Sequence, residues 1–271
     1  MHPLIDEHVV KAIRSTGNMN ETLTNRVDIL EAYNLPYDRS ADNVIISGCQ
    51  IPYSIPAVLQ KFSRILDNGG ISFTFLSQEY CCGNTLYRPA VKERNDDALN
   101  ECRSLSREFI SLNLQMAREL GSRRIVIFCS PCYPIYKYAF PQEEIIFYPQ
   151  ALLEAISTME WNHEIDYYAG CYRLHRRLAP VPMELQSTNA VFNKIHGLDI
   201  NRISAPACCY TPDGLNHMIR NVKTRYMVHV CTGCYLQALL HMPEDAKTQV
   251  LMLPEFLCML NEEEHPGENI S

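Results

Sequence analysis

Ten of the twelve cysteines of this 271-residue chain follow one pattern that occurs twice. Each copy has a single Cys after a short apolar run, an adjacent Cys-Cys pair after 31 or 36 intervening residues, and then a C-x-x-C motif. Five thiols that recur in the same order indicate two multinuclear metal centres. The first Cys set comprises Cys49, Cys81, Cys82, Cys129 and Cys132, and the second Cys set comprises Cys171, Cys208, Cys209, Cys231 and Cys234.

The composition disfavours several other classes of protein. A hydrophobic content of 46% is typical of a globular chain. Residues 1–10 lack the basic flank and apolar run of a signal peptide, and no stretch of about 18 apolar residues suggests a membrane span. We therefore predict a cytoplasmic, reducing location, in which dense cysteines indicate metal or catalysis more than a secreted disulfide scaffold. A net charge of -7 argues against nucleic acid as a partner.

Apolar runs precede the cysteines and predict the fold. Such runs cover residues 44–47, 125–128 and 226–230, directly before Cys-containing segments. Runs that are apolar on both faces are typical of strands in a covered parallel sheet, and ligands bind at the carboxyl ends of such strands. We predict an α/β protein with two homologous Rossmann-like halves, each with a small parallel sheet and its cysteines at the strand C-terminal ends.

A second repeat outside the cysteines supports two halves. Residues 145–153 resemble residues 250–258, and in both an apolar strand runs into a helix with proline in its first turn. The predicted domains are an N-terminal helical arm at 1–41, a first repeat at 42–160, a second repeat at 161–262 and an acidic tail at 263–271.

The halves differ between the Cys-Cys pair and the C-x-x-C motif, with 46 intervening residues in the first and 21 in the second. The additional length predicts an amphipathic helix over residues 97–120, on whose apolar face Cys102 lies. Cys258 occupies the place of Leu153 in the second repeat. Because a free Cys packs as a small hydrophobe, we interpret Cys102 and Cys258 as core residues and not as ligands.

These spacings suggest two kinds of metal centre, an iron-sulfur cluster or a zinc site. C-x-x-C is a common half of a tetrahedral zinc site, and such a site takes four ligands. Each set offers five thiols, and two of these are consecutive. Adjacent cysteines diverge in a strand, so they serve different irons of a larger cluster better than one ion. We favour iron-sulfur clusters and keep zinc in at least one half as an alternative.

At the two Cys sets the chain resembles the cysteine-rich CCG-domain proteins, typified by the catalytic iron-sulfur subunit of heterodisulfide reductase. The arm carries a further likeness, because residues 16–18 and 25–30 resemble the connector that follows a cubane-cluster module in longer relatives; a simple surface helix is the alternative. No cubane Cys motif precedes this connector. The residues that carry the main resemblance are Gly48-Cys49, Tyr80-Cys81-Cys82-Gly83, Cys129-Ser130-Pro131-Cys132, Gly170-Cys171, Ala207-Cys208-Cys209 and Cys231-Thr232-Gly233-Cys234.

The resemblance implies that each set binds a noncubane [4Fe-4S] cluster. It implies the catalytic subunit of a heterodisulfide-reductase-like complex, which reduces a disulfide of thiol cofactors such as CoM-S-S-CoB between the two clusters. The implied partners are a cubane [4Fe-4S] electron-transfer subunit and a flavoprotein beyond it. Two alternatives remain: an electron-transfer subunit for glycolate, lactate or succinate oxidation, and a non-redox assembly protein with structural zinc.

Two groups of polar residues near the cysteines are candidates for binding the substrate. Arg173, His175 and Arg176 follow Cys171, and Arg suits bidentate contact with a sulfonate or phosphate. A solvated helix face is the alternative for them. His229 precedes the second C-x-x-C motif within an apolar run, where a packed histidine is the usual interpretation. We also expect that Tyr210, which follows the second pair in place of a glycine, crowds the backbone there.

Overall fold

The computed structural model describes residues 1–171 and 178–264, and it divides the chain into two compact units. Each Cys set lies within one unit, the first set in unit 1 and the second set in unit 2. The chain crosses between the units several times. Unit 1 comprises Met1–Gln60, Ile71–Tyr148 and Arg173–Met183, and unit 2 comprises Lys61–Gly70, Pro149–Tyr172 and Glu184–Ser271.

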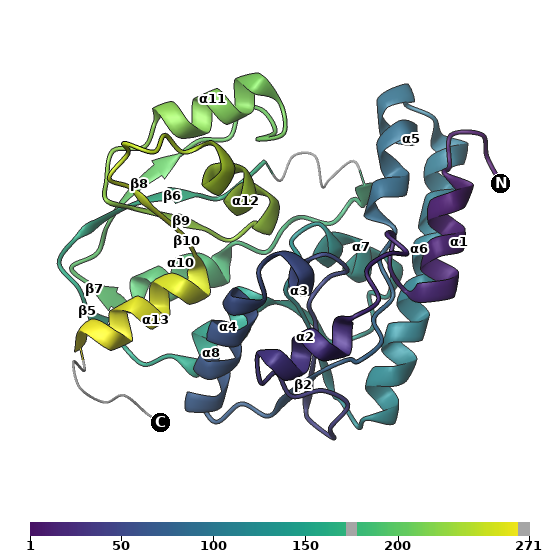
Figure 1. The fold of residues 1–271 in the computed structure, drawn as a ribbon, viewed down its shortest axis with the longest axis horizontal. Helices are drawn as coiled ribbons and strands as arrows, with labels where there is room; N and C mark the ends of the chain where they lie inside the picture. Colours follow the sequence, from purple (N-terminus) through teal and green to yellow (C-terminus); the bar gives the residue numbers. More distant parts are fainter. Residues whose placement is uncertain (172–177, 265–271) are drawn as a thin grey trace. The chain divides into compact units, whose positions relative to one another are not determined.

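A parallel four-stranded sheet forms the centre of unit 1 (Figure 1). Its spatial order is β2-β1-β3-β4, and β1 is buried at all four positions. Burial of this kind explains the continuous apolar sequence that predicts these strands, because helices cover both faces of a parallel sheet. The strands are β1 (Asn43–Ile46), β2 (Phe73–Phe75), β3 (Arg124–Ile127) and β4 (Ile145–Phe147).

Helices α1 and α2 precede these strands, α3 to α7 and one 3-10 turn connect them, and α8 follows the last strand. The longest of these helices is α6, with 24 residues. It begins after the cap residue Asn95 and buries Ala98, Cys102, Leu105 and Phe109, which confirms the helix predicted over 97–120. The elements are α1 (Glu7–Thr16), α2 (Arg26–Ala32), α3 (Ile51–Ser54), α4 (Pro56–Asn68), η1 (Asn84–Leu86), α5 (Tyr87–Glu93), α6 (Asp96–Glu119), α7 (Cys132–Ala139) and α8 (Tyr148–Ala155).

Unit 2 has a second parallel four-stranded sheet, in the order β10-β9-β6-β8. In Figure 1, α11 and α12 lie on one side of this sheet and α13 on the other. A short parallel pair, β5 with β7, lies apart from it. The elements are β5 (Met159–Glu160), β6 (Glu164–Tyr168), α10 (Gln186–Asn193), β7 (Ile195–His196), β8 (Asp199–Ile203), α11 (Pro212–Arg220), β9 (Tyr226–His229), α12 (Thr232–His241), β10 (Gln249–Met252) and α13 (Leu253–Glu264).

The two sheets have the same topology. Strands β6, β8, β9 and β10 take the places of β1, β2, β3 and β4, so the order matches when one sheet is read from its other edge. Both sheets end in a strand that runs directly into a helix with proline at its second position, Pro149 in α8 and Pro254 in α13. The prediction of an α/β fold with two small parallel sheets in homologous halves is confirmed. The domain boundaries given above stay a prediction.

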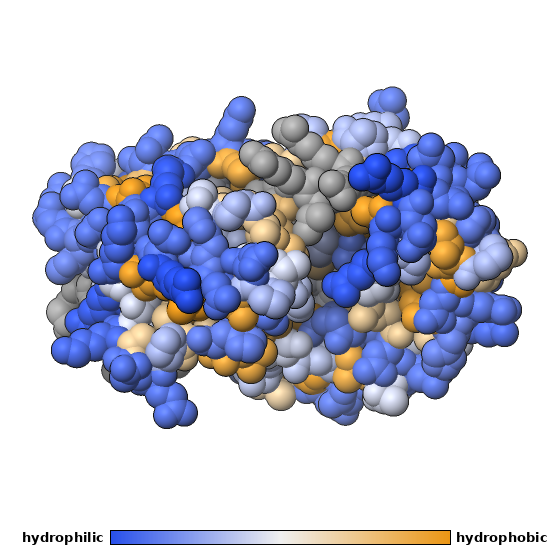
Figure 2. Space-filling model, turned by 90° about the horizontal axis from the view of Figure 1, so that it is seen from above, coloured by the Kyte–Doolittle hydropathy of each residue, from blue (hydrophilic) through white to orange (hydrophobic). Residues whose placement is uncertain are grey.

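The described surface is mainly polar. On the face drawn in Figure 2, hydrophilic side chains predominate and apolar ones gather in small separate patches. The most exposed large apolar side chain is Leu240, beside Leu239 near the end of α12. Across residues 1–171 and 178–264, none of the helices combines the length and the apolar character that a membrane crossing requires.

Candidate metal centre

The first Cys set gathers where three strands of unit 1 end. Cys49 comes three residues after β1, the Cys81-Cys82 pair follows β2, and Cys129 comes two residues after β3. The last member, Cys132, begins helix α7. Parallel strands end at one edge of their sheet, so this edge collects cysteines that are up to 83 positions apart in sequence.

The thiols of the first set form a continuous chain of contacts. The Sγ atoms of Cys82 and Cys132 lie 3.2 Å apart. Hydrogen bonds also link Cys49 with Cys81, Cys81 with Cys82, and Cys132 with Cys129. Cys81, Cys82 and Cys132 are buried, while Cys49 and Cys129 are half-buried. All five predicted ligands of the first set therefore come together.

The second Cys set repeats this chain of contacts in unit 2. The Sγ atoms of Cys209 and Cys234 lie 3.5 Å apart, and they take the places of Cys82 and Cys132. Further hydrogen bonds link Cys171 with Cys208, Cys208 with Cys209, and Cys234 with Cys231. The same order of neighbours thus arises twice, although the connecting segments differ in length.

Packing thiols together in this way makes most of them hard to ionise. Hydrogen bonds with Cys132 and Cys81 lower the pKa of Cys82 to about 6. The pKa of Cys132 is raised, first by its hydrogen bond with Cys129. In the second set, contact with Cys208 raises the pKa of Cys209 to about 12. Thiols release their protons when they bind a metal, because the cation stabilises the negative charge of the resulting thiolate.

A buried carboxylate ties together the two loops that carry Cys49 and the Cys81-Cys82 pair. Oε1 of Glu79 accepts a 2.7 Å hydrogen bond from the Gly48 N–H, and Oε2 accepts 3.0 and 2.8 Å bonds from the N–H and hydroxyl of Ser47. Arg26 pairs with the same carboxylate at 2.8 Å and also donates to the Leu76 carbonyl. Both charged side chains are buried, so each depends on the other.

The N-terminal connector contacts the first set directly, which favours a specific role over a simple surface helix. The Cys81 N–H donates to the Gly17 carbonyl at 2.7 Å, and the Asn18 amide donates to the Cys49 carbonyl at 2.7 Å. Gly17 has a φ of 78°, and a Cβ there would lie 2.6 Å from the Glu79 carbonyl oxygen. Glycine is therefore required where the arm meets the loop of the Cys-Cys pair.

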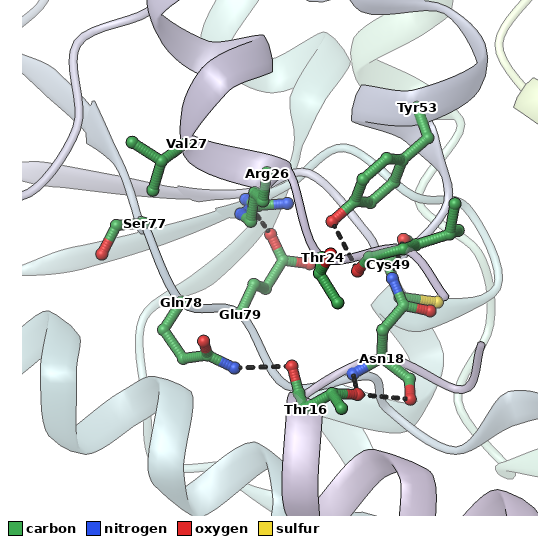
Figure 3. Close-up of a pocket in the computed structure, with 11 residues that line it drawn as sticks. Thr16, Asn18, Thr24, Arg26, Val27, Cys49, Tyr53, Ser77, Gln78 and Glu79 are labelled. Atoms are coloured by element: carbon green, nitrogen blue, oxygen red, sulfur yellow. Dashed lines mark hydrogen bonds and ion pairs between the residues drawn. The ribbon is translucent and has the colours of Figure 1, made fainter. Parts of the chain in front are cut away.

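A cavity of about 290 Å³ adjoins Cys49 (Figure 3). Its lining is mostly polar, and its charged side chains, Arg26 and Glu79, neutralise one another. The Tyr53 hydroxyl donates to the Leu23 carbonyl at its rim. The remaining lining residues are Thr16, Asn18, Thr24, Val27, Ser77 and Gln78. This cavity brings a polar surface without net charge to one end of the first Cys set.

Helix α6 supports the first Cys-Cys pair from outside the set. The side chain of Asn113 makes two 2.7 Å bonds with the Tyr80 backbone, one with its N–H and one with its carbonyl. Ser106 donates to the Cys82 carbonyl at 2.6 Å and accepts from the Tyr87 hydroxyl. The longer segment of the first half thus supplies backbone hydrogen bonds that hold the paired cysteines in place.

A local turn holds the second Cys-Cys pair, Cys208-Cys209, in place. The Thr211 N–H and hydroxyl both donate to the Cys208 carbonyl, and a Cβ at Gly214 would lie 2.1 Å from that oxygen. Gly83, after the first pair, is left-handed with a φ of 74°, whereas Tyr210 is not among the described residues with positive φ. Tyr210 is 59% exposed and its ring lies against Gly233. It covers the second C-x-x-C motif from outside.

The other residues that the sequence analysis singled out lie in three different settings. Cys102 and Cys258 are buried, and their thiols lie against the carbonyls of Leu86 and Lys61. His229 is fully buried in β9 beside the second Cys set. The predicted substrate-binding residues Arg173, His175 and Arg176 lie outside the described residues.

Sequence reasoning missed several residues that support the two sets. Glu79 and Ser47 were not singled out, although each lies two residues before a cysteine of the set. Tyr168 was missed as well, and only the alignment of β6 with β1 would have pointed to it, since it stands where the first half has Ile46. Asn113 carried no local signal, because its partner Tyr80 is 33 residues away.

The arrangement fits a multinuclear centre better than a single ion. Within residues 1–171 and 178–264, no three His, Cys, Asp or Glu side chains converge closely enough to enclose one metal ion. Each set presents five thiols in an extended chain of contacts. Soft thiolates are the usual ligands of iron-sulfur clusters, which present several metal atoms to one set of cysteines.

Known proteins resemble this chain over about half of its length. Residues 44–134 match the cysteine-rich domain family named CCG. One subunit of the dihydromethanophenazine:CoB–CoM heterodisulfide reductase of Methanosarcina barkeri is 27% identical over 146 residues, and the corresponding subunit in Methanosarcina acetivorans is 25% identical over the same length. Each match covers 49% of this chain and 34% of the relative.

A different oxidoreductase shows a similar likeness. The EtfAB:quinone oxidoreductase of Syntrophomonas wolfei is 26% identical over 152 residues, which are 51% of this chain and 20% of that protein. The matched segments span about a third or less of the relatives' own length. Together the relatives support an oxidoreductase-type subunit with iron-sulfur chemistry. Residues 44–134, which carry the first Cys set, match the cysteine-rich CCG domain family, and the chain resembles a subunit of heterodisulfide reductase.

Proposed function

We propose that this chain is the iron-sulfur catalytic subunit of a heterodisulfide-reductase-like complex. The proposed reaction cleaves the S–S bond of a mixed disulfide of thiol cofactors, such as CoM-S-S-CoB. The disulfide takes up two electrons and two protons and yields two thiols, so R–S–S–R′ + 2e⁻ + 2H⁺ gives RSH and R′SH. The electrons come one at a time from a partner iron-sulfur protein, as its own clusters are one-electron carriers.

The observation that carries the proposal is the repeated chain of five thiol contacts. Cys49-Cys81-Cys82-Cys132-Cys129 in unit 1 matches Cys171-Cys208-Cys209-Cys234-Cys231 in unit 2, member for member. A single ion uses three or four of such ligands, whereas five thiols suit a larger cluster in each unit. We infer two noncubane [4Fe-4S] clusters, one in each set. When bound, these clusters supply one-electron steps and iron atoms with affinity for sulfur.

The residues around the first set have two roles in this proposal. Glu79 and the Gly17 carbonyl hold the Cys49 and Cys81 loops at fixed positions, so that five ligands meet without a large loss of entropy on metal binding. The cavity beside Cys49 admits small polar groups from solvent. Because Arg26 and Glu79 compensate each other there, the anionic tail of a thiol cofactor needs a different partner, and Arg173, His175 and Arg176 remain the proposed one.

The proposed partners follow from the same reasoning. A cubane [4Fe-4S] electron-transfer protein delivers electrons singly, and a flavoprotein beyond it receives a pair and passes them on one at a time. The likeness to a heterodisulfide reductase subunit supports this assignment. We also propose that the two repeats act as separate domains, at 42–160 and 161–262.

An electron-transfer role is the second candidate. The likeness to an EtfAB:quinone oxidoreductase favours it, since the name of that relative specifies electron transfer to a quinone and no disulfide. In this role the clusters pass electrons onward and bind no thiol. The two candidates differ in one measurable property, the response of the clusters to a disulfide or a thiol.

Metal analysis of the full chain tests the proposal first. We would purify it anaerobically, determine iron, zinc and acid-labile sulfide per chain, and record Mössbauer spectra. Two [4Fe-4S] clusters correspond to about eight irons and eight sulfides, with signals unlike those of a cubane. About four irons would restrict the proposal to one set and favour electron transfer. Zinc without sulfide would overturn it.

Cysteine variants then assign the iron to residues. Cys82→Ser should remove the iron of the first set, close to half of the total, because this thiol contacts two other members of its set. Cys102→Ser is the matched control: its thiol is equally buried but faces the Leu86 carbonyl, so iron should stay unchanged. Addition of CoM-S-S-CoB to the reduced protein should oxidise the clusters and release two thiols. Reduced clusters that do not react with it would favour the electron-transfer role.

A further inference from the structure

The two sheets differ at one pair of residues directly beneath the cysteines. In unit 1, Ile46 of β1 is paired in register with Ile127 of β3. In unit 2, the equivalent pair is Tyr168 of β6 with His229 of β9. Each pair stands at the ends of the strands that lead to the single Cys and to the C-x-x-C motif. Two apolar side chains of the first half are thus replaced by two polar ones.

The polar pair is fully buried and has no hydrogen-bond partner in the described part of the chain. Tyr168 and His229 are both 0% exposed. The Tyr168 hydroxyl and both ring nitrogens of His229 have no partner among residues 1–171 and 178–264. Buried polar groups in folded proteins are almost always hydrogen-bonded, because desolvation without a bond is unfavourable. An unpartnered group at such a position indicates that something else binds there.

The surroundings of the pair identify what binds. The two rings lie 5.8 Å apart in a T-shaped arrangement, and the ring of Tyr235, next to Cys234, lies 6.4 Å from His229. The pKa of Tyr168 is raised, first by burial and then by the charges of Cys234, Cys209, Cys171 and Cys208. Tyr168 ends β6 three residues before Cys171, so it lies at the edge of the sheet where the second Cys set gathers. His229 ends β9 two residues before Cys231, and an imidazole ring has an N–H that can donate a hydrogen bond.

We propose that Tyr168 and His229 donate hydrogen bonds to sulfur atoms of the centre held by the second Cys set, and that this centre is therefore easier to reduce than the one in the first set. The inference rests on the proposed function, because it needs an iron-sulfur centre in each set. Hydrogen bonds to cluster sulfurs stabilise the more negative, reduced state and raise the reduction potential. Ile46 and Ile127 offer no such bond, so the first centre lacks this stabilisation.

Redox titration of variants tests this inference. Tyr168→Phe removes a single hydroxyl oxygen, and His229→Leu removes both ring nitrogens at similar burial. Each variant should lower the midpoint potential of the second centre, by about 59 mV for a tenfold change in a one-electron equilibrium. The potential of the first centre should not move. Ile46→Leu and Ile127→Leu are the matched controls, and they should shift neither potential.

The titration is followed by EPR on anaerobically purified full-length protein, with iron measured in every sample. Cys209→Ser, which removes a ligand of the second set, identifies the signal of the second centre. Deuterium exchange should shift the Fe–S vibrations of the unmodified second centre more than those of the Tyr168→Phe variant, because the exchanged proton bonds to sulfur.

The outcomes separate this inference from the proposed function. No iron in the unmodified protein would overturn the proposed function. Full iron with an unchanged second potential in both Tyr168→Phe and His229→Leu would overturn the inference alone. Loss of second-set iron from Tyr168→Phe, with the first set intact, would support the inference, since only the proposed hydrogen bond has been removed.

Discussion

The Oε1 atom of Glu79 accepts a 2.7 Å hydrogen bond from the backbone N–H of Gly48, and this bond joins the loops that carry two parts of the first Cys set. Gly48 directly precedes Cys49, and Glu79 lies two residues before Cys81. The same carboxylate is paired with the buried guanidinium of Arg26. The geometry of the proposed ligands thus depends on a residue that is not a ligand.

Replacement of this carboxylate should disturb the fold and the iron of unit 1 together. Glu79→Gln leaves Arg26 buried without a counter-charge, which typically costs about 3–5 kcal/mol of unfolding free energy. We expect iron in the first set to fall while the second set keeps its own. Glu108→Gln is the control, because its ion pair with Arg14 is exposed and is typically worth less than about 1 kcal/mol. Urea denaturation and iron analysis measure both effects, and equal behaviour of the two variants would contradict the prediction.

Gly48 cannot carry a side chain. Its φ of 97° lies in the left-handed region, and a Cβ would lie 2.7 Å from the Cβ of Cys129 and 3.2 Å from its Sγ. Gly48→Ala should therefore displace Cys49 or Cys129 and remove iron from the first set. Gly70→Ala provides the control, because Gly70 also has a positive φ, 67°, but no atom within 4 Å of the added Cβ.

The control separates backbone strain from steric conflict. Gly70→Ala should cost about 1–2 kcal/mol for the left-handed conformation and leave the iron content unchanged. Thermal unfolding and iron analysis of both variants distinguish backbone strain from steric conflict. Full iron in Gly48→Ala would show that the Cys49 and Cys129 loops tolerate displacement.

Helix α6 should matter for the first Cys-Cys pair through one side chain. Asn113→Ala leaves the partly buried Tyr80 N–H and carbonyl without their 2.7 Å partners, at a cost of up to about 1–3 kcal/mol for each unsatisfied group. We expect weaker iron retention by the first set under mild chelation. Asn100→Ala, on the exposed face of the same helix, should behave like the unmodified protein. Equal chelation rates for the two variants would argue against the role of Asn113.

The Cys102 thiol predicts a specific pH dependence of stability. Burial raises its pKa from 9 to about 11. Between these values the unfolded chain has lost the proton that the folded chain still holds, so this group stabilises the fold below pH 9 and loses that contribution as the pH rises towards 11. The loss is at most about 1.4 kcal/mol per pH unit. The Cys102→Ala variant lacks this pH-dependent contribution to stability.

Anaerobic urea denaturation of the protein and of Cys102→Ala at several pH values between 8 and 11 measures this effect as a difference. The unfolding free energy of the unmodified protein should fall more steeply than that of the variant. Parallel curves would show that the thiol of Cys102 ionises as readily in the folded protein as in the unfolded chain.

The sequence by itself determined the two Cys sets, the parallel sheets and the long helix. These features are written in local patterns: thiols at fixed spacing, apolar runs that make buried strands, and an amphipathic period that makes α6. The likeness of the two sheets could also be predicted, because the 145–153 and 250–258 segments carry the same strand-to-helix pattern. Such signals depend on neighbours in the chain, so no tertiary information is needed to read them.

Only the tertiary structure decided which residues support the cysteines. Glu79 reaches Gly48 across 31 positions, and Asn113 reaches Tyr80 across 33. Tyr168 and His229 look like ordinary members of apolar strands until the register places them opposite each other with no described partner. Hydrogen bonds between distant segments and the burial of polar atoms depend on how the strands are aligned. That alignment is a property of the folded sheet, and no local pattern in the sequence contains it.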